Sequence, residues 1–170
     1  MGKLRVVQYI NQFFAQVGGE DKADYPMEYH EGPMVPGLAF QQAFGDEAEI
    51  VGTIVCGDSY FGENTDKVKP EILKKVAELK PDLFIAGPAF NAGRYGFACA
   101  TIAAAVKDEL HIPVITGMYV ENPGADEAKS KIYIVSTKNS AAGMRDAVKK
   151  MAPLGLKIAR GEKIGSSKEE

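Results

Sequence analysis

The chain contains few of the residues that build disulfide frameworks or metal sites. Its 170 residues include no tryptophan, two cysteines and two histidines. Cys56 and Cys99 cannot form a disulfide framework, which fits a reducing compartment. His30 and His111 show no metal-ligand spacing with the cysteines. We therefore expect no metal in this chain and no secreted fold held by disulfides.

A basic excess and long apolar runs are also missing. Twenty Lys and Arg residues stand against 23 Asp and Glu residues, a formal net charge of −3, whereas a nucleic-acid surface needs a basic excess. No apolar run approaches the ~20 residues of a membrane helix. The N-terminus passes directly into a strand pattern, without the apolar region of a signal peptide. We expect a cytoplasmic protein that binds neither nucleic acid nor membrane.

Apolar segments that alternate with helical patterns predict the α/β class. We expect a single open, mostly parallel five-stranded sheet with helices on both faces, flavodoxin- or Rossmann-like, over residues 1–160, and a linker-like or frayed tail over residues 161–170. The predicted strands are 4–10, 49–56, 83–86, 112–117 and 131–136. The predicted helices are 36–44, 65–79, 96–111 and a last one that opens at Ser140 and is broken or kinked at Pro153.

Two polar segments are predicted as loops. Residues 11–32 are long for a loop and rich in aromatic residues, and loops of this length are more often functional than idle. A peripheral flap or a subunit contact explains the same segment equally well. Residues 57–64 follow the second predicted strand and lead into a helix.

Residues 83–96 are the most informative stretch, because an apolar strand runs there into a glycine-rich corner before a helix. In open α/β sheets such corners lie at the carboxyl ends of strands, where ligands bind and helix N-termini attract anions. The stretch matches neither a P-loop nor the Gly-x-Gly-x-x-Gly fingerprint. Arg94 adds a planar cationic fork suited to a carboxylate or a phosphate. We predict a small-anion site formed by Gly87, Asn91, Gly93, Arg94 and Tyr95; alternatively, the glycines only permit a tight turn.

Polar residues that follow the second and fourth predicted strands are expected at the same edge of the sheet. Asp58 and Tyr60 could position a substrate amine, with Tyr60 offering a cation–π contact. Tyr119 and Glu121, which follow the fourth predicted strand, could also position a substrate. In each case turn chemistry or helix capping is the alternative.

Cys56 and Cys99 are candidate nucleophiles near this edge. A thiol close to a helix N-terminus has a lowered pKa and is more reactive, so the pair could act as in a two-thiol racemase. The alternative is that both are small buried hydrophobic residues, the usual role of a free cysteine.

Several motifs, in order along nearly the whole chain, together resemble one family. The sequence resembles the N-terminal part of selenoprotein B, the substrate-specific component B subunit of the glycine, sarcosine and betaine reductases. The motifs are Tyr9-Ile-Asn-Gln-Phe-Phe14, Gly18-Gly-Glu20, Gly37-Leu-Ala-Phe40, Cys56-Gly-Asp58, Gly87-Pro-Ala-Phe-Asn-Ala-Gly-Arg-Tyr-Gly96, Thr116-Gly-Met-Tyr119, Glu121-Asn-Pro-Gly124 and Ser140-Ala-Ala-Gly-Met144.

The resemblance implies part of an oxidoreductase that uses a disulfide as acceptor. Component B splits the C–N bond of glycine, sarcosine or betaine, and the carboxymethyl group passes to selenoprotein A. The family's selenocysteine lies in a C-terminal half and its pyruvoyl group in a partner subunit, so both are expected outside this chain. The implied partners are that missing half or partner subunit, the pyruvoyl-containing subunit, selenoprotein A and a small carboxylate substrate, in a homo- or hetero-oligomer.

The chain ends at Glu170 without a selenocysteine. The resemblance therefore implies an N-terminal domain, a split subunit or a truncated product, with no catalytic residue expected here beyond the candidates Cys56 and Cys99. The alternative function is a non-catalytic α/β module for small-anion binding or assembly that lacks the redox half.

Overall fold

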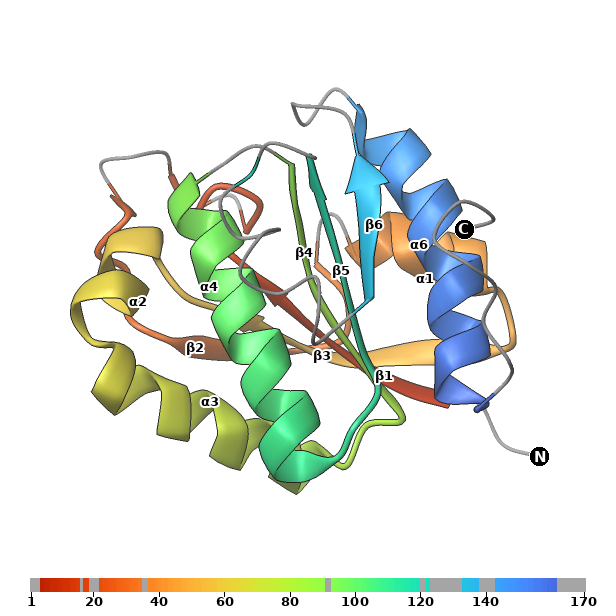
Figure 1. Cartoon of the computed structure of the whole chain (residues 1–170), viewed down its shortest axis with the longest axis horizontal. Coiled ribbons are helices and arrows are strands. Elements are labelled where there is room, and N and C mark those ends of the chain that lie inside the picture. Colours follow the sequence, from red (N-terminus) through yellow and green to blue (C-terminus); the bar gives the residue numbers. More distant parts are fainter. Residues whose placement is uncertain are drawn as a thin grey trace.

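The computed structural model describes residues 4–15, 17–18, 22–34, 37–90, 93–119, 122, 133–137 and 143–161. These residues form one six-stranded sheet in the order β2-β3-β1-β4-β5-β6, with helices on both faces (Figure 1). The predicted open α/β sheet is confirmed. Within the described residues, no helix is long and apolar enough to cross a membrane.

Five of the strands run parallel and one runs antiparallel. Among the parallel strands, chain order and spatial order give the sequence 2-1-3-4-5, which is the flavodoxin-like arrangement. The order reverses between β1 and β4, and ligands of such sheets bind outside the carboxyl ends of the strands at that point. The parallel strands are β1 (Leu4–Ile10), β3 (Ala48–Val55), β4 (Leu83–Phe90), β5 (Val114–Tyr119) and β6 (Tyr133–Thr137).

The antiparallel strand β2 (Glu28–Glu31) was not expected, since we predicted a loop over residues 11–32 and five strands. Its sequence, Glu-Tyr-His-Glu, has no apolar run, and none of its four residues is fully buried. The strand forms because it pairs with the open edge of β3. Pairing with the β3 backbone, rather than the composition of residues 28–31, makes this segment extended.

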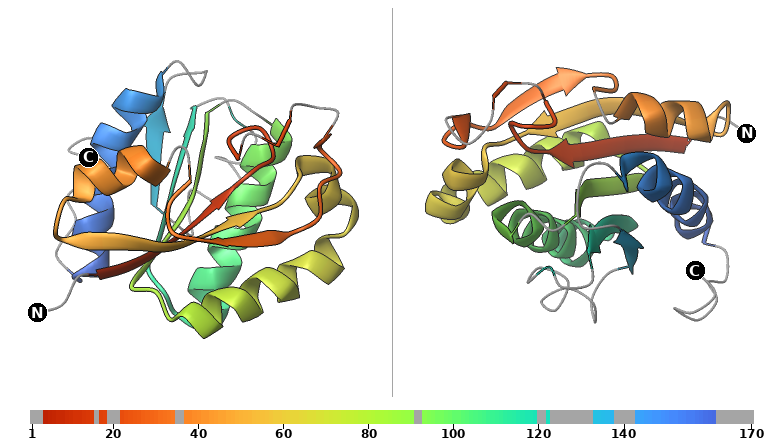
Figure 2. Two further views of the ribbon diagram at one scale, coloured as in Figure 1. Left: turned by 180° about the vertical axis from the view of Figure 1, so that it is seen from behind. Right: turned by 90° about the horizontal axis from the view of Figure 1, so that it is seen from above.

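The helices form two layers around the sheet (Figure 2). On one face α1 and α6 pack against each other and against the sheet. On the other face α3 and α4 pack, with the short α2 beside them and a π-helical turn, η2, extending α4. The bounds are α1 (Gly37–Phe44), α2 (Asp58–Glu63), α3 (Thr65–Leu79), α4 (Gly93–Ala105), η2 (Val106–Leu110) and α6 (Met144–Ala159).

Successive side chains of β1 point to opposite faces of the sheet and join different halves of the core. Val7 and Tyr9 join the cluster under α3 and α4, whereas Val6 joins the cluster under α1 and α6. Every residue of β4 is buried, as expected of a central strand covered on both faces. The pair of strands β1 and β4 is therefore covered by a hydrophobic cluster on each face of the sheet.

Several predicted boundaries are wrong, and the largest differences are three. The strand predicted over 83–86 runs on to Phe90, because Phe90 pairs with Met118 after an irregular register over residues 87–89. Most of the predicted 57–64 loop is helix α2, whose first N–H groups bond to the carbonyl of Ala23. Helix α6 is not broken at Pro153 but continues to Ala159, since buried residues on both sides of the proline hold it against the sheet. Ser140 and residues 162–170 of the predicted tail lie outside the described residues.

Candidate functional site

The carboxyl ends of β1, β3 and β4 meet at the point where the strand order reverses. The chain leaves β1 into Asn11 and Gln12, and it leaves β3 through Gly57 into Asp58 at the start of α2. Helix α4 begins three residues after β4 ends, at Gly93. The polar residues of these exits form the candidate site.

A buried hydrogen-bond network connects the ends of β1 and β3. Asn11 Nδ2 donates to Asp58 Oδ2 at 3.0 Å, and the Asp58 backbone N–H donates to Gln12 Oε1 at 3.1 Å. Asn11 Oδ1 also accepts the N–H of Phe14 at 3.0 Å. The exposed fractions of Asn11, Gln12 and Asp58 are 4%, 3% and 8%. A carboxylate buried this deeply requires partners of this kind.

Asp58 Oδ1 has no hydrogen-bond partner within the described part of the chain. The hydroxyls of Tyr9 and Tyr95 interact with the thiols of Cys56 and Cys99, which are weak partners. Both tyrosine side chains are fully buried, and their ring centroids are 6.4 Å apart. We call Tyr9, Asn11, Gln12, Asp58 and Tyr95 the Asp58 cluster. Buried polar atoms without partners are uncommon in folded proteins.

Burial is the largest influence on the pKa values of the ionisable groups in this cluster. It raises the pKa of the Asp58 carboxyl above its usual value, although hydrogen bonds from the Asn11 and Gln12 side chains oppose the rise. It also raises the pKa of Tyr9 and of Tyr95 well above the ordinary tyrosine value, with the Asp58 charge adding to both. The carboxylate and the two phenols are thus close enough to influence one another.

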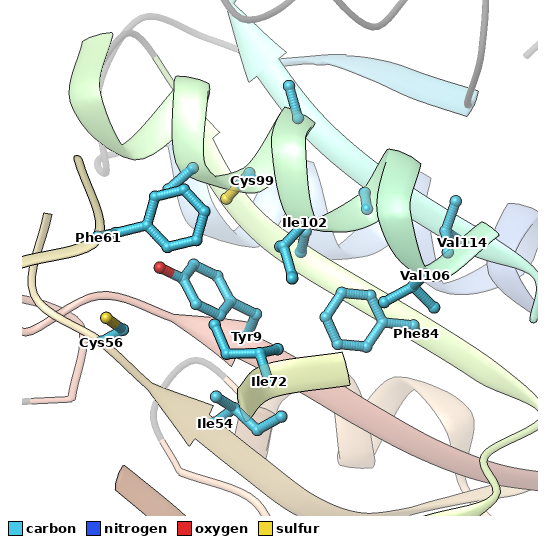
Figure 3. Close-up of a cluster of buried hydrophobic side chains, with 14 of the residues drawn as sticks. Tyr9, Ile54, Cys56, Phe61, Ile72, Phe84, Cys99, Ile102, Val106 and Val114 are labelled. Carbon is cyan, nitrogen blue, oxygen red and sulfur yellow. The ribbon is translucent and has the colours of Figure 1, made fainter. Parts of the chain in front are cut away.

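Cys56 and Cys99 lie in the core next to the Asp58 cluster (Figure 3). Burial raises the pKa of Cys56 to about 12 and that of Cys99 well above its usual value. The expectation of a lowered thiol pKa is therefore wrong, because desolvation outweighs the helix N-terminus near Cys99. Both thiols are unpaired and buried, which agrees with the alternative that they pack as small hydrophobic residues.

These thiols give a direct test of the core. In the native chain neither thiol should react appreciably with a disulfide reagent such as DTNB at mildly alkaline pH, since both are buried and protonated. In denaturant both should react at the rate of a free thiol. Rapid labelling of one thiol in the native chain would show that the core opens there, and mass spectrometry of the labelled peptides would identify which one.

Arg94 projects from the first turn of α4 and is exposed. Its Nη1 donates a short hydrogen bond to Ser59 Oγ. Ser59 directly follows Asp58 in the chain, so the exposed guanidinium and the buried carboxylate approach the same short segment of α2. The predicted cation and the predicted amine-binding acid are brought together.

The other predicted site residues lie in different surroundings. Gly87 belongs to β4, where it has φ +88° and its carbonyl accepts Gln8 Nε2 at 2.7 Å. Tyr95 points into the core rather than toward an exposed anion. Tyr60 is partly buried and packs against the core, and Tyr119 is half-buried at the end of β5. Gly93 starts α4, whereas Asn91 and Glu121 lie outside the described residues.

The predicted site omitted Tyr9, Asn11 and Gln12, although the structure places them at its centre. The signal was available, because an Asn-Gln pair directly after an apolar strand is a polar strand end at the ligand-binding edge. A second buried atom without a described partner, Gln8 Oε1, lies on the opposite face of β1 near Gly37. It belongs to the α1 side and is separate from the Asp58 cluster.

The fold and this edge define a class, the doubly wound α/β domain with polar groups gathered at its topological switch point. Sequence comparison then gives the family. The model of the family "Glycine/sarcosine/betaine reductase selenoprotein B" matches residues 3–170. The chain therefore belongs to the glycine/sarcosine/betaine reductase selenoprotein B family.

Three relatives illustrate the family. The chain is 55% identical over 170 residues to the sarcosine reductase complex component B subunit beta of Peptoclostridium acidaminophilum, and 54% identical over 170 residues to the glycine reductase complex component B subunit gamma of Carboxydothermus hydrogenoformans. It is 42% identical over 166 residues to the betaine reductase complex component B subunit beta of P. acidaminophilum. The alignments cover 100%, 100% and 98% of the chain but 39%, 39% and 38% of the relatives.

Proposed function

We propose that the chain acts as the N-terminal part of a component B subunit in a glycine, sarcosine or betaine reductase, where it binds the substrate through its carboxylate. The component B relatives support the first half of this proposal. The observation that carries the second half is Arg94, an exposed guanidinium on the first turn of α4 at the switch point.

The position of Arg94 suits a carboxylate for two reasons. A guanidinium presents two parallel N–H donors to the two oxygens of a carboxylate. Helix α4 is 13 residues long, and the positive end of its dipole lies in the same turn. All three substrates named by the relatives carry one carboxylate, so a single site of this kind would serve each of them.

In this proposal the chain binds and orients the substrate, while the redox groups lie elsewhere. The C–N cleavage and transfer of the carboxymethyl group to selenoprotein A would require the selenocysteine and the pyruvoyl group of the partner half and subunit. The two cysteines here are buried with raised pKa values, which supports placing the reactive groups outside this chain. Unpaired thiols also support a location in the reducing cytoplasm.

Replacing Arg94 with alanine tests the carboxylate site. Loss of a charge-assisted hydrogen-bonded pair costs about 1.5–3 kcal/mol, or roughly a 10- to 150-fold weaker affinity. Calorimetric titration of glycine, sarcosine and betaine into complete component B should show this loss for all three. Lysine at position 94 keeps the charge but not the fork, so it should give an intermediate affinity.

The matched control is Arg145→Ala, which removes an exposed arginine from α6 on the opposite side of the sheet. This variant should bind as the parent does. Equal affinities of the Arg94→Ala variant and the parent for all three ligands would contradict the assignment of Arg94 to the carboxylate.

A further inference from the structure

Helix α1 exposes a surface that carries no charge. None of its eight residues, Gly37–Phe44, is charged, although Leu38, Gln42 and Ala43 are exposed. The side chain of Leu38 is 51% exposed. A helix on a protein surface normally presents charged and polar residues on the side that faces away from the core. The outer side of α1 is therefore typical of a helix that another segment covers.

A groove lies between α1 and α6, which pack side by side on one face of the sheet (Figure 2). Its volume is about 680 Å³. We call it the α1–α6 groove, and the residues that line it include Ala39, Ala43, Met144, Arg145, Val148 and Lys149. Four of these six side chains are apolar, so the groove offers apolar surface next to the uncharged side of α1.

The charges at this groove are all positive. Arg145 and Lys149 are exposed and lie about one turn apart on α6. Neither forms an ion pair with another described residue, whereas the adjacent Lys150 pairs with Asp146 at 3.3 Å. Among the described residues, no acidic side chain lines the groove. The chain as a whole has a formal net charge of −3, so this local basic rim favours an acidic partner.

We propose that the α1–α6 groove holds an acidic amphipathic helix from the part of the component B subunit that lies outside this chain. The proposal rests on the first half of the proposed function, the place of this chain in component B. The relatives contain such a part, since the alignments cover only 39% of two component B subunits. An apolar groove accepts the apolar face of an amphipathic helix. Two carboxylates one turn apart on that helix match the spacing of Arg145 and Lys149.

A second copy of this chain fits the groove less well. Two copies related by a twofold axis would place the same surface patch on itself. Arg145 and Lys149 of one copy would then face the same residues of the other, and like charges across an interface repel. Helix α1 brings no carboxylate to offset this repulsion. The charge of the groove therefore favours a segment of different composition.

Thiol labelling at position 43 tests whether the groove is covered. In the chain alone, the thiol of Ala43→Cys should react as an exposed cysteine, because the native cysteines are buried. In complete component B it should react at least about tenfold more slowly, since a covalently linked segment stays docked most of the time. The matched control is Ala77→Cys, an exposed alanine of α3 on the other face of the sheet. Its thiol should react equally fast in both.

Reversal of one rim charge tests the acidic character of the occupant. In complete component B, Lys149→Glu should speed the labelling of Ala43→Cys several-fold, because it places a carboxylate against those of the docked helix. Arg145→Ala leaves Lys149 in place, and a single exposed ion pair contributes little. That variant should therefore remain docked and label as slowly as the parent.

A photo-crosslinking amino acid at position 43 identifies the occupant in complete component B. We expect cross-links to a peptide of the same subunit outside this chain, with acidic and apolar residues at helical spacing. Cross-links to a second copy, to another subunit or to a segment without acidic residues would overturn the proposal. Absence of any cross-link, or equal labelling of Ala43→Cys and Ala77→Cys in complete component B, would overturn it as well.

These measurements separate the groove from the substrate site, because none of them uses a substrate. If Arg94→Ala leaves the affinity for all three ligands unchanged, the carboxylate site is rejected and the groove is unaffected. If position 43 is open in complete component B while Arg94→Ala weakens binding, the proposed function stands and the docking of a helix in the groove is rejected.

Discussion

Replacing Gly57 with alanine is expected to destabilise the chain by about 3 kcal/mol, the upper part of the range for overpacking. A Cβ atom at this position would lie 2.3 Å from the carbonyl oxygen of Ala23 and 2.6 Å from the backbone nitrogen of Tyr25. These are main-chain atoms, so no change of rotamer can relieve the contact. The backbone conformation of Gly57 is ordinary, with φ −67°, which leaves close approach as the reason for glycine.

The contact cannot open easily, because hydrogen bonds hold the two segments together. The N–H of Gly57 donates to Tyr25 O at 2.8 Å, and the N–H groups of Ser59 and Tyr60 donate to Ala23 O at 2.8 and 3.0 Å. These bonds satisfy the start of α2 and thereby position Asp58. Relief of the clash would break them and displace the candidate site.

This prediction is tested by measuring the free energy of unfolding in urea for two variants, Gly57→Ala and Gly62→Ala. Gly62 lies in the same helix, α2, and nothing stands within 4 Å of the Cβ that alanine would add. Gly62→Ala should be neutral or stabilise by up to about 1 kcal/mol, because alanine is the better helix former. Equal stability of the two variants would mean that residues 23–25 do not pack on α2.

The sequence predicted the elements that carry their own apolar pattern. Residues 4–10 form β1 with the predicted bounds, and α3 follows the predicted helical spacing over 65–79. The missed elements depend on other parts of the chain. Strand β2 needs the open edge of β3, and α2 needs the carbonyl of Ala23 to accept its first N–H groups.

The candidate site was predicted only in part, because some of its features also depend on distant parts of the chain. Arg94 and Asp58 were selected because they follow strands, and the sheet order brings both to α2. Sequence position near a helix N-terminus suggested a reactive Cys99, but burial, which raises its pKa, depends on how α4 packs on the sheet. Tyr95 was correctly placed near the edge, yet only packing turns its ring inward.

Removing the Asn11 side chain is expected to be as costly as the Gly57 change, and its cost should depend on pH. Asn11→Ala deletes the donor to Asp58 Oδ2 and the acceptor for the N–H of Phe14. A buried hydrogen bond to a charged group contributes about 1.5–3 kcal/mol. The loss of that bond should raise the pKa of Asp58 further above its usual value, since Asn11 is one of the groups that lower it.

The sign of the pH dependence follows from that raised pKa. A carboxyl whose pKa is higher in the folded than in the unfolded chain favours folding while it is protonated, and this contribution is lost as pH rises through the folded-state pKa. Asn11→Ala should therefore cost least at acidic pH, where Asp58 is neutral in both states. Its cost should increase toward neutral pH as the carboxylate ionises without its donor.

A double-mutant cycle with Asp58→Ala isolates this interaction, because alanine removes both carboxylate oxygens. Near neutral pH the two positions should couple by about 1.5–3 kcal/mol, and the coupling should shrink at acidic pH. The bond to Phe14 is lost in both backgrounds and cancels in the cycle. Additive effects at neutral pH would mean that Asp58 does not depend on Asn11, and the carboxylate would then need another partner in the folded chain. Coupling of the expected size would establish that Asp58 is ionised in the folded chain and that the Asn11 amide stabilises its charge.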